Sequence, residues 1–245
     1  MLHDAHFHLR DNDLFEELIK HRIQGIVNAE SPKEYDCLIQ YLSRYGNDDI
    51  QISAGIHPWK ADQITWEEMA PIMEKVNFIG EIGLDNVWCE TDMQKQKEVF
   101  DRSLHYASCA HKPVILHLKG MEKEALSYIR KYENKYLVHW YSCLNYLQEF
   151  QKLGCYFTVG PSIGKEEAVN QVAKQIPLDH LMLESDGLDA LSWCENRAVS
   201  AKEYSMFLNR SITEIARIKR CEEAQVKEAL NHTFRQFVLS DPSKE

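Results

Sequence analysis

The chain has 245 residues, of which 44% are apolar and 27% are charged, and its formal net charge is −10. This length is enough for one large domain with a full core, so neither a disulfide nor a metal ion is needed merely for folding. The acidic balance argues against a broad basic surface that coats nucleic acid, but a local electropositive pocket built on metal ions is compatible with it.

The seven cysteines are spread singly and form no C-x-x-C pair. We expect reduced thiols that act as small core hydrophobes, and no disulfide framework or thiolate zinc cluster. The N-terminal residues are too polar for a signal peptide, and no run reaches the ~18 apolar residues of a membrane span. The sequence therefore predicts a cytoplasmic protein that has no membrane contact and no obligate protein partner.

Short apolar runs alternate with longer helical patterns along the chain. The predicted strands are Leu2–Leu9, Gly25–Glu30, Gln51–His57, Asn77–Leu84, Pro113–Leu118, Tyr136–Trp140, Cys155–Gly160 and His180–Asp186. The predicted helices are Lys33–Arg44, Met93–His111, Glu122–Tyr132, Glu166–Gln175, Lys202–Ile218 and a closing helix, Glu222–Leu239. Apolar strands separated by helices are typical of a parallel sheet covered on its outer face. Eight such units favour an α/β fold, a single (β/α)8 TIM barrel over residues 1–245.

Polar side chains fall at or near the C-terminal ends of these strands. Such residues are costly in a buried strand unless they are paired or bound to a metal ion. In a TIM barrel, the C-terminal strand ends surround one shared cavity, where active sites are found. The residues concerned are His6, His8, His57, Glu81, His117, His139 and Asp186.

The residue types in this set suit divalent metal ions. Each histidine of the set, taken alone, also has a structural interpretation as a hydrogen-bonded core residue. The histidines outside the pattern are expected to be surface or ordinary structural residues: His3, His21, His105, His111, His180 and His232. Four histidines of the set (His6, His8, His117 and His139) and the two carboxylates instead match, at one rim, the nitrogen and oxygen ligands of Mg²⁺, Mn²⁺ or Zn²⁺. Two such ions can activate water and polarise a phosphate ester. We therefore predict a metal site at the C-terminal rim.

The ordered motifs D-A-H-F-H, G-I-H-P, G-E-I-G-L-D, P-V-I-L-H, H-W-Y-S and L-E-S-D resemble those of the TatD family of metal-dependent hydrolases, within the amidohydrolase-like barrels. The resemblance covers almost the full length of the chain. It implies a deoxyribonuclease that cleaves phosphodiester bonds with a metal-activated water. DNA ends or another phosphate ester would be the substrate.

The resemblance also implies a role for each site residue. Two divalent metal ions would be held, the first by His6, His8 and Asp186 and the second by His117 and His139. Glu81 would bridge the two ions, and Asp186 would also orient the attacking water.

Three further residues receive roles near the metal ions. His57 would lie beside the scissile phosphate, and Asp4 would accept a hydrogen bond that orients a ligand. Lys119 would either bind a substrate phosphate or belong to the solvated surface.

Two stretches depart from the family pattern. The family usually has a small, glycine-containing turn after the sixth strand and a proline-containing loop after the eighth. This chain instead has His139–Cys143 and Gly187–Asn196, and we expect the latter to be a loop that borders the pocket. The aromatic residues of these stretches either stack on bases or pack against neighbouring loops. They are Trp140, Tyr141 and Trp193.

Two other functions remain open at this point. The first is an amidohydrolase-like small-molecule hydrolase that acts on C–N or ester bonds, although Glu81 stands where many of those enzymes use a carboxylated lysine. The second is a degenerate barrel that acts as a binding or scaffold protein, although none of the six ligands is missing.

Overall fold

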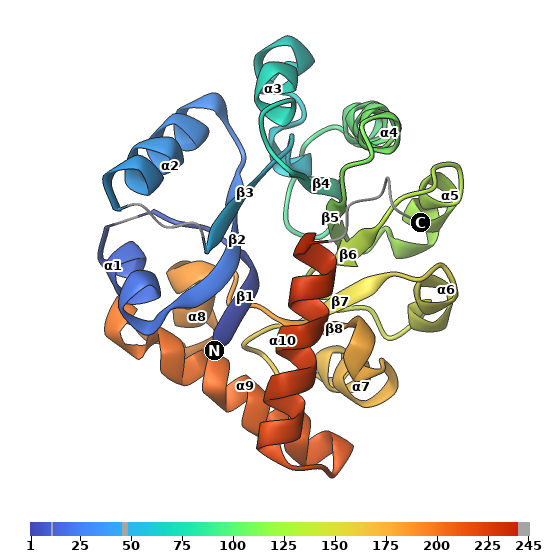
Figure 1. The fold of residues 1–245 in the computed structure, drawn as a ribbon. Helices are drawn as coiled ribbons and strands as arrows, with labels where there is room; N and C mark the ends of the chain where they lie inside the picture. Colours follow the sequence, from blue (N-terminus) through green and yellow to red (C-terminus); the bar gives the residue numbers. More distant parts are fainter. Residues whose placement is uncertain (11, 46–48, 240–245) are drawn as a thin grey trace.

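The computed structural model describes residues 1–10, 12–45 and 49–239. Eight parallel strands pair in chain order and curl into a nearly closed ring (Figure 1). They are β1 (Leu2–Phe7), β2 (Ile23–Ala29), β3 (Ile50–Ala54), β4 (Phe78–Asp85), β5 (Val114–Lys119), β6 (Tyr136–Val138), β7 (Tyr156–Val159) and β8 (Leu181–Leu183). The ring is joined beside β8, where the backbone N–H of Asp186 donates to the carbonyl of His6 at 3.1 Å. This arrangement confirms the predicted TIM barrel.

Helices cover the outer face of the ring, and the strands between them are buried on both faces (Figure 1). The helices are α1 (Asn12–His21), α2 (Pro32–Tyr45), α3 (Trp66–Met73), α4 (Met93–Cys109), α5 (Glu122–Ile129), α6 (Leu147–Lys152), α7 (Glu167–Gln175), α8 (Gly187–Glu195), α9 (Tyr204–Lys219) and α10 (Glu223–Leu239). Local signals define their starts: the Asp92 carboxylate accepts from Lys95 N–H at 2.9 Å and caps α4. None of the helices in the described residues combines the length and apolarity that crossing a membrane requires.

Two sequence predictions differ from the observed elements. The strands end earlier than expected, so His57, His139 and Asp186 lie beyond their strands, in the turns that follow them. The segment predicted as a loop after β8 is helix α8, so that prediction was wrong. A left-handed backbone at Asp186 and Gly187 (φ 59° and 87°) turns the chain directly from β8 into this helix.

Helix α10 closes the N-terminal end of the barrel. Figure 1 shows it crossing in front of the strands, and its Phe234 and Phe237 pack against residues near the strand starts, such as Phe78 and Met182. His3 of β1 stacks on Phe234 with ring centroids 4.7 Å apart. The opposite, C-terminal end is therefore the end at which a site can open to solvent.

Candidate metal centre

The carboxylate of Glu81, on β4, lies at the centre of a group of histidines. Its two oxygens are 2.7–3.5 Å from five imidazole nitrogens, those of His6, His8, His57, His117 and His139. Oε2 faces His6 and His8, whereas Oε1 faces His57, His117 and His139. The carboxylate thus has a separate set of nitrogen neighbours on each oxygen, as a bridging ligand would have.

Asp186 completes the side of this group that solvent can reach. Its Oδ1 lies 3.4 Å from His6 Nε2 and 3.5 Å from His8 Nε2. The side chains of Asp186 and His8 are each 21% exposed, whereas that of Glu81 is 2% exposed. Asp186 holds a left-handed backbone conformation, φ 59°, which is strained for a residue other than glycine and is typical of functional sites.

A glycine allows β4 and β5 to approach closely at the site. Gly83 pairs with His117 across the two strands, and a Cβ atom at Gly83 would lie only 1.7 Å from the His117 carbonyl oxygen. Any larger residue would push β5 away. The absence of a side chain at Gly83 therefore helps to bring His117 of β5 close to Glu81, which lies two residues before Gly83 on β4.

The charges of the site favour a bound cation. Burial raises the pKa of Glu81, but His139, His57 and His6 outweigh it and hold that pKa well below its ordinary value. Burial lowers the pKa of His6, but Glu81 and Asp186 raise it well above the ordinary value. Burial raises the pKa of Asp186, but the neighbouring histidines outweigh this effect and lower that pKa to about 2. Both carboxylates are therefore anions in a buried pocket.

Asp85, at the end of β4, determines which nitrogen of His117 carries a proton. Its Oδ2 lies 2.8 Å from His117 Nε2, so that nitrogen donates and Nδ1 presents a lone pair. This Nδ1 lies 2.7 Å from Glu81 Oε1, which is also an acceptor. Two acceptors at this distance require a positive charge between them, either a proton or a metal ion. No role for Asp85 was predicted from the sequence, although the motif G-E-I-G-L-D contains it.

Several buried donor atoms also lack a hydrogen-bond partner among the described residues. Those at the site are both ring nitrogens of His6, Nδ1 of His139 and both carboxylate oxygens of Glu184; Asn28 Nδ2 and Ser103 Oγ are the others. His139 and Glu184 face each other, with His139 Nδ1 3.5 Å from Glu184 Oε2. Because leaving such groups unsatisfied is costly, the donor set fits a divalent cation better than an empty core.

Asp4 and Lys119 lie close to the centre but outside it. Asp4 Oδ1 accepts from the backbone N–H groups of His6 and Ser185, at 3.2 and 3.1 Å, so it orients the backbone that carries a candidate ligand rather than a ring nitrogen. Lys119 is buried, and its Nζ donates to the carbonyl of Trp140 at 2.5 Å, so the solvated-surface alternative was wrong.

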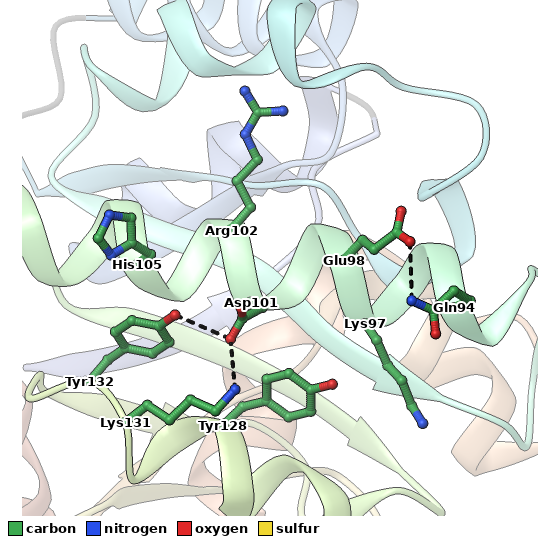
Figure 2. Close-up of a pocket in the computed structure, with 9 residues that line it drawn as sticks. All are labelled: Gln94, Lys97, Glu98, Asp101, Arg102, His105, Tyr128, Lys131 and Tyr132. Carbon is green, nitrogen blue, oxygen red and sulfur yellow. Dashed lines mark hydrogen bonds and ion pairs between the residues drawn. The ribbon is translucent and has the colours of Figure 1, made fainter.

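A second concave region lies on the outer helices. This hollow of about 640 Å³ sits between α4 and α5, where Figure 2 shows Lys131 and Tyr132 both directed at Asp101. Its basic side chains are each paired with a carboxylate, Lys97 with Glu124, Arg102 with Glu67 and Lys131 with Asp101, and none of the predicted site residues lines it. It offers no chemistry comparable to that of the rim.

Comparisons with known proteins agree with this geometry. The chain is 29% identical over 210 residues to the putative deoxyribonuclease TATDN3 of Mus musculus, which covers 75% of this chain and 71% of that protein. It is 27% identical over 206 residues to the uncharacterized metal-dependent hydrolase YabD of Bacillus subtilis, covering 76% and 80% of the two. The crystal structure of YJJV, a TatD homolog from Escherichia coli, has the same fold, with a TM-score of 0.82 at 20% identity and coverage of 96% and 97%.

A sequence model of one family spans nearly the whole chain. Its description is "TatD related DNase", and it matches residues 3–238, a range that contains every candidate ligand at the rim. This chain therefore belongs to the TatD-related DNase family.

Proposed function

We propose that this protein hydrolyses phosphodiester bonds in DNA, with two divalent ions, Mg²⁺, Mn²⁺ or Zn²⁺, at the C-terminal rim. The observation that carries the proposal is the buried Glu81 carboxylate with distinct imidazole neighbours on each oxygen. The family, and relatives named as deoxyribonucleases and metal-dependent hydrolases, support it.

The two sides of Glu81 supply the ligands of the two ions. His6, His8 and Asp186, with Glu81 Oε2, would hold one ion, and His117 and His139, with Glu81 Oε1, would hold the other. Divalent ions bound there would act as Lewis acids toward a phosphate ester. In the small-molecule alternative, a carboxylated lysine would occupy the position of Glu81. Lys119, which lies next to the site, instead donates a hydrogen bond to the Trp140 carbonyl.

Asp186 is the residue best placed to accept a proton from the attacking water. It combines partial exposure with a low pKa, so it faces the entrance as a carboxylate. Its backbone N–H is fixed on the His6 carbonyl, which keeps the carboxylate beside the candidate ligands. A positioned base of this kind typically contributes a rate factor of about 10² to 10⁴.

His57 is placed to act on the phosphate rather than on a metal ion. Its Nδ1 accepts from Trp59 N–H at 3.2 Å, so the ring carries its proton on Nε2. That Nε2 lies 3.5 Å from Glu81 Oε1 and faces the centre of the site. It can therefore donate a hydrogen bond to a phosphoryl oxygen and stabilise the charge that develops there.

The test compares substrates and metals on the purified protein. Single-stranded and nicked DNA, a chromogenic phosphodiester and a panel of lactones are assayed with Mg²⁺, Mn²⁺ and Zn²⁺, and with a chelator. We expect metal-dependent DNA hydrolysis that the chelator abolishes. Lactone hydrolysis without phosphodiester hydrolysis, under every metal, would establish the small-molecule alternative instead.

A further inference from the structure

Two tryptophans are exposed and in contact with each other at the barrel mouth. Trp88 is 59% exposed and Trp193 is 64% exposed. Their ring centroids are 6.2 Å apart, with an edge-to-face angle of 86°. An exposed pair of indoles beside the rim of the barrel, where the candidate ligands lie, marks an interaction site rather than a part of the core.

The pair reaches across the mouth, because its two members come from opposite sides of the ring. Trp88 follows β4 and Trp193 lies on α8, which follows β8, and strands four apart in an eight-stranded ring face each other. Trp140, which follows β6, lies below them, with its ring centroid 6.1 Å from that of Trp193. Its indole N–H donates to Ser162 Oγ at 3.0 Å, so this lower ring is anchored.

The loop that carries Trp88 is held by Asp85, the carboxylate that also hydrogen-bonds the candidate ligand His117. Asp85 Oδ1 accepts from the backbone N–H groups of Val87 and Trp88, at 2.7 and 2.9 Å. Its Oδ2 accepts from His117 Nε2 and from the indole N–H of Trp59, at 2.8 and 2.6 Å. The same carboxylate thus orients a candidate metal ligand and fixes the backbone at Trp88, so the turn that carries the exposed indole is preorganised.

The charges around α8 offer little for a nucleic-acid backbone. The basic side chains that reach this helix are paired with its own carboxylates: Arg10 with Asp189, and Lys165 and Arg210 with Glu195, at 2.8–2.9 Å. The chain as a whole carries a net charge of −10. Contacts with bases, rather than with phosphates, must then supply most of the affinity at this face.

We propose that Trp88 and Trp193 form a stacking subsite for unpaired bases of the nucleic acid whose phosphate enters the metal centre. This inference rests on the proposed function. The flat face of a base stacks on an aromatic side chain without regard to sequence, a contact that typically contributes about 1–3 kcal/mol per base. A base-paired end presents its faces already stacked, so the subsite selects a single-stranded end over a duplex.

The test compares two single-stranded pentanucleotides that carry the same phosphates, one with bases and one abasic. Binding is measured by fluorescence anisotropy in the slowly turning-over Asp186→Asn background, and KM is measured in the otherwise unaltered enzyme. We expect Trp88→Ala and Trp193→Ala each to raise Kd and KM about tenfold on DNA with bases and to leave both values unchanged on abasic DNA. Trp193→Phe should retain most of the affinity.

Leu239→Ala is the matched control, because Leu239 is 74% exposed at the end of α10, the helix that closes the opposite end of the barrel. An equal loss on both oligonucleotides would assign the tryptophans a merely structural role and overturn the proposal. The proposal would also be overturned if Trp88→Ala and Trp193→Ala left Kd unchanged but converted a dimer to a monomer in sedimentation experiments. The two tryptophans would then form a contact between two copies of the chain. Base-dependent binding without any hydrolysis would refute the phosphodiesterase and leave the subsite standing.

Discussion

Glu81 is a carboxylate with 1% exposure inside a barrel, a place where an unpaired charge costs several kcal/mol. Five imidazoles within 3.5 Å compensate for that cost. They do so fully only if positive charge is shared among them, because the imidazoles facing one carboxylate oxygen cannot all remain neutral acceptors. A site of this kind is therefore most stable with cations bound, and its residues are expected to bind metal as a unit.

Replacing Glu81 by glutamine tests this expectation. The amide has nearly the same shape but neither the charge nor the second acceptor oxygen, so Glu81→Gln should lose at least one equivalent of bound metal and most of the activity. Elemental analysis of the purified variant measures the metal directly. Glu68→Gln is the matched control, because Glu68 serves only the capping box of α3 with Thr65. Wild-type metal content in Glu81→Gln would contradict the bridging role.

Asp186 allows metal binding and catalysis to be separated. Asp186→Asn should retain part of the bound metal, because His6, His8 and Glu81 remain, and should lower kcat by about 100-fold or more as the proton acceptor is lost. The measurement is kcat at saturating metal, with metal content determined on the same sample. A kcat within a factor of two of the wild-type value would show that Asp186 is a ligand only.

At the scale of whole elements, the site depends on how closely two strands can approach. β4 carries Glu81 and β5 carries His117, and the two strands meet at Gly83 with no room for a side chain. The structure places α8 in a similar relation to β1, because a Cβ at Gly187 would lie 2.7 Å from the His8 carbonyl oxygen. These two close backbone contacts position candidate ligands that lie on different elements. They are made possible by glycines and not by the ligand side chains themselves.

Gly83→Ala should therefore disturb both stability and the site. The added methyl group would meet the His117 carbonyl, and relief of this overpacking is expected to cost about 3 kcal/mol or more. Urea denaturation measures the loss, and the metal content should fall with it. Gly154→Ala is the control: Gly154 has φ 72° and no atom within 4 Å of the new Cβ, so only conformational strain of about 1 kcal/mol should appear. Equal losses in the two variants would refute the steric explanation.

At the scale of the whole molecule, the two ends of the barrel differ in structure: one is closed by an apolar helix and the other carries the polar site residues. Helix α10 closes the N-terminal end with Phe234 and Phe237, while the C-terminal end holds the polar group. His3 connects the closed end: its Nδ1 donates to Asn231 Oδ1 of α10 at 2.8 Å, and its Nε2 accepts from the N–H of Leu183 on β8 at 3.0 Å. This histidine can make both bonds only while it is neutral.

Stability should consequently fall in mild acid. Burial lowers the pKa of His3 from 6.5 to about 4. The His3 imidazole then binds a proton at a higher pH in the unfolded chain than in the folded protein. Its contribution to the free energy of unfolding is therefore complete above pH 6.5 and is lost as the pH falls toward 4. Between pH 7 and pH 5 the loss amounts to about 2 kcal/mol.

The measurement is denaturant unfolding at the two pH values, in chelator, for the wild-type protein and for His3→Gln. The glutamine variant should be less stable at pH 7 but should lose about 2 kcal/mol less on acidification, because other titrating groups are common to both proteins. His180→Gln, at a partly exposed histidine, should keep the wild-type pH dependence. An identical pH dependence in His3→Gln would contradict the assignment.

The barrel and the residues at its rim could both be predicted from the order of amino acids along the chain. Eight apolar runs with helices between them sufficed for the fold, because in parallel strands burial on both faces leaves a continuous apolar pattern. The motifs placed His6, Glu81 and Asp186 near strand ends, and the topology of a parallel barrel brings such ends together. The resemblance of those motifs to the TatD family was likewise confirmed.

How these residues face one another could not be predicted, because it depends on the packing of elements that are distant along the chain. The division of histidines between the two oxygens of Glu81, the proton assignment that Asp85 imposes on His117, and the contact between Trp88 and Trp193 all join distant parts of the chain. Helix α8, which follows β8, was also not predicted from the sequence. It begins after a strained, left-handed backbone conformation at Asp186, which is maintained by the surrounding packing. Patterns along a chain report burial and local propensity, whereas distances between side chains on different strands are set by packing.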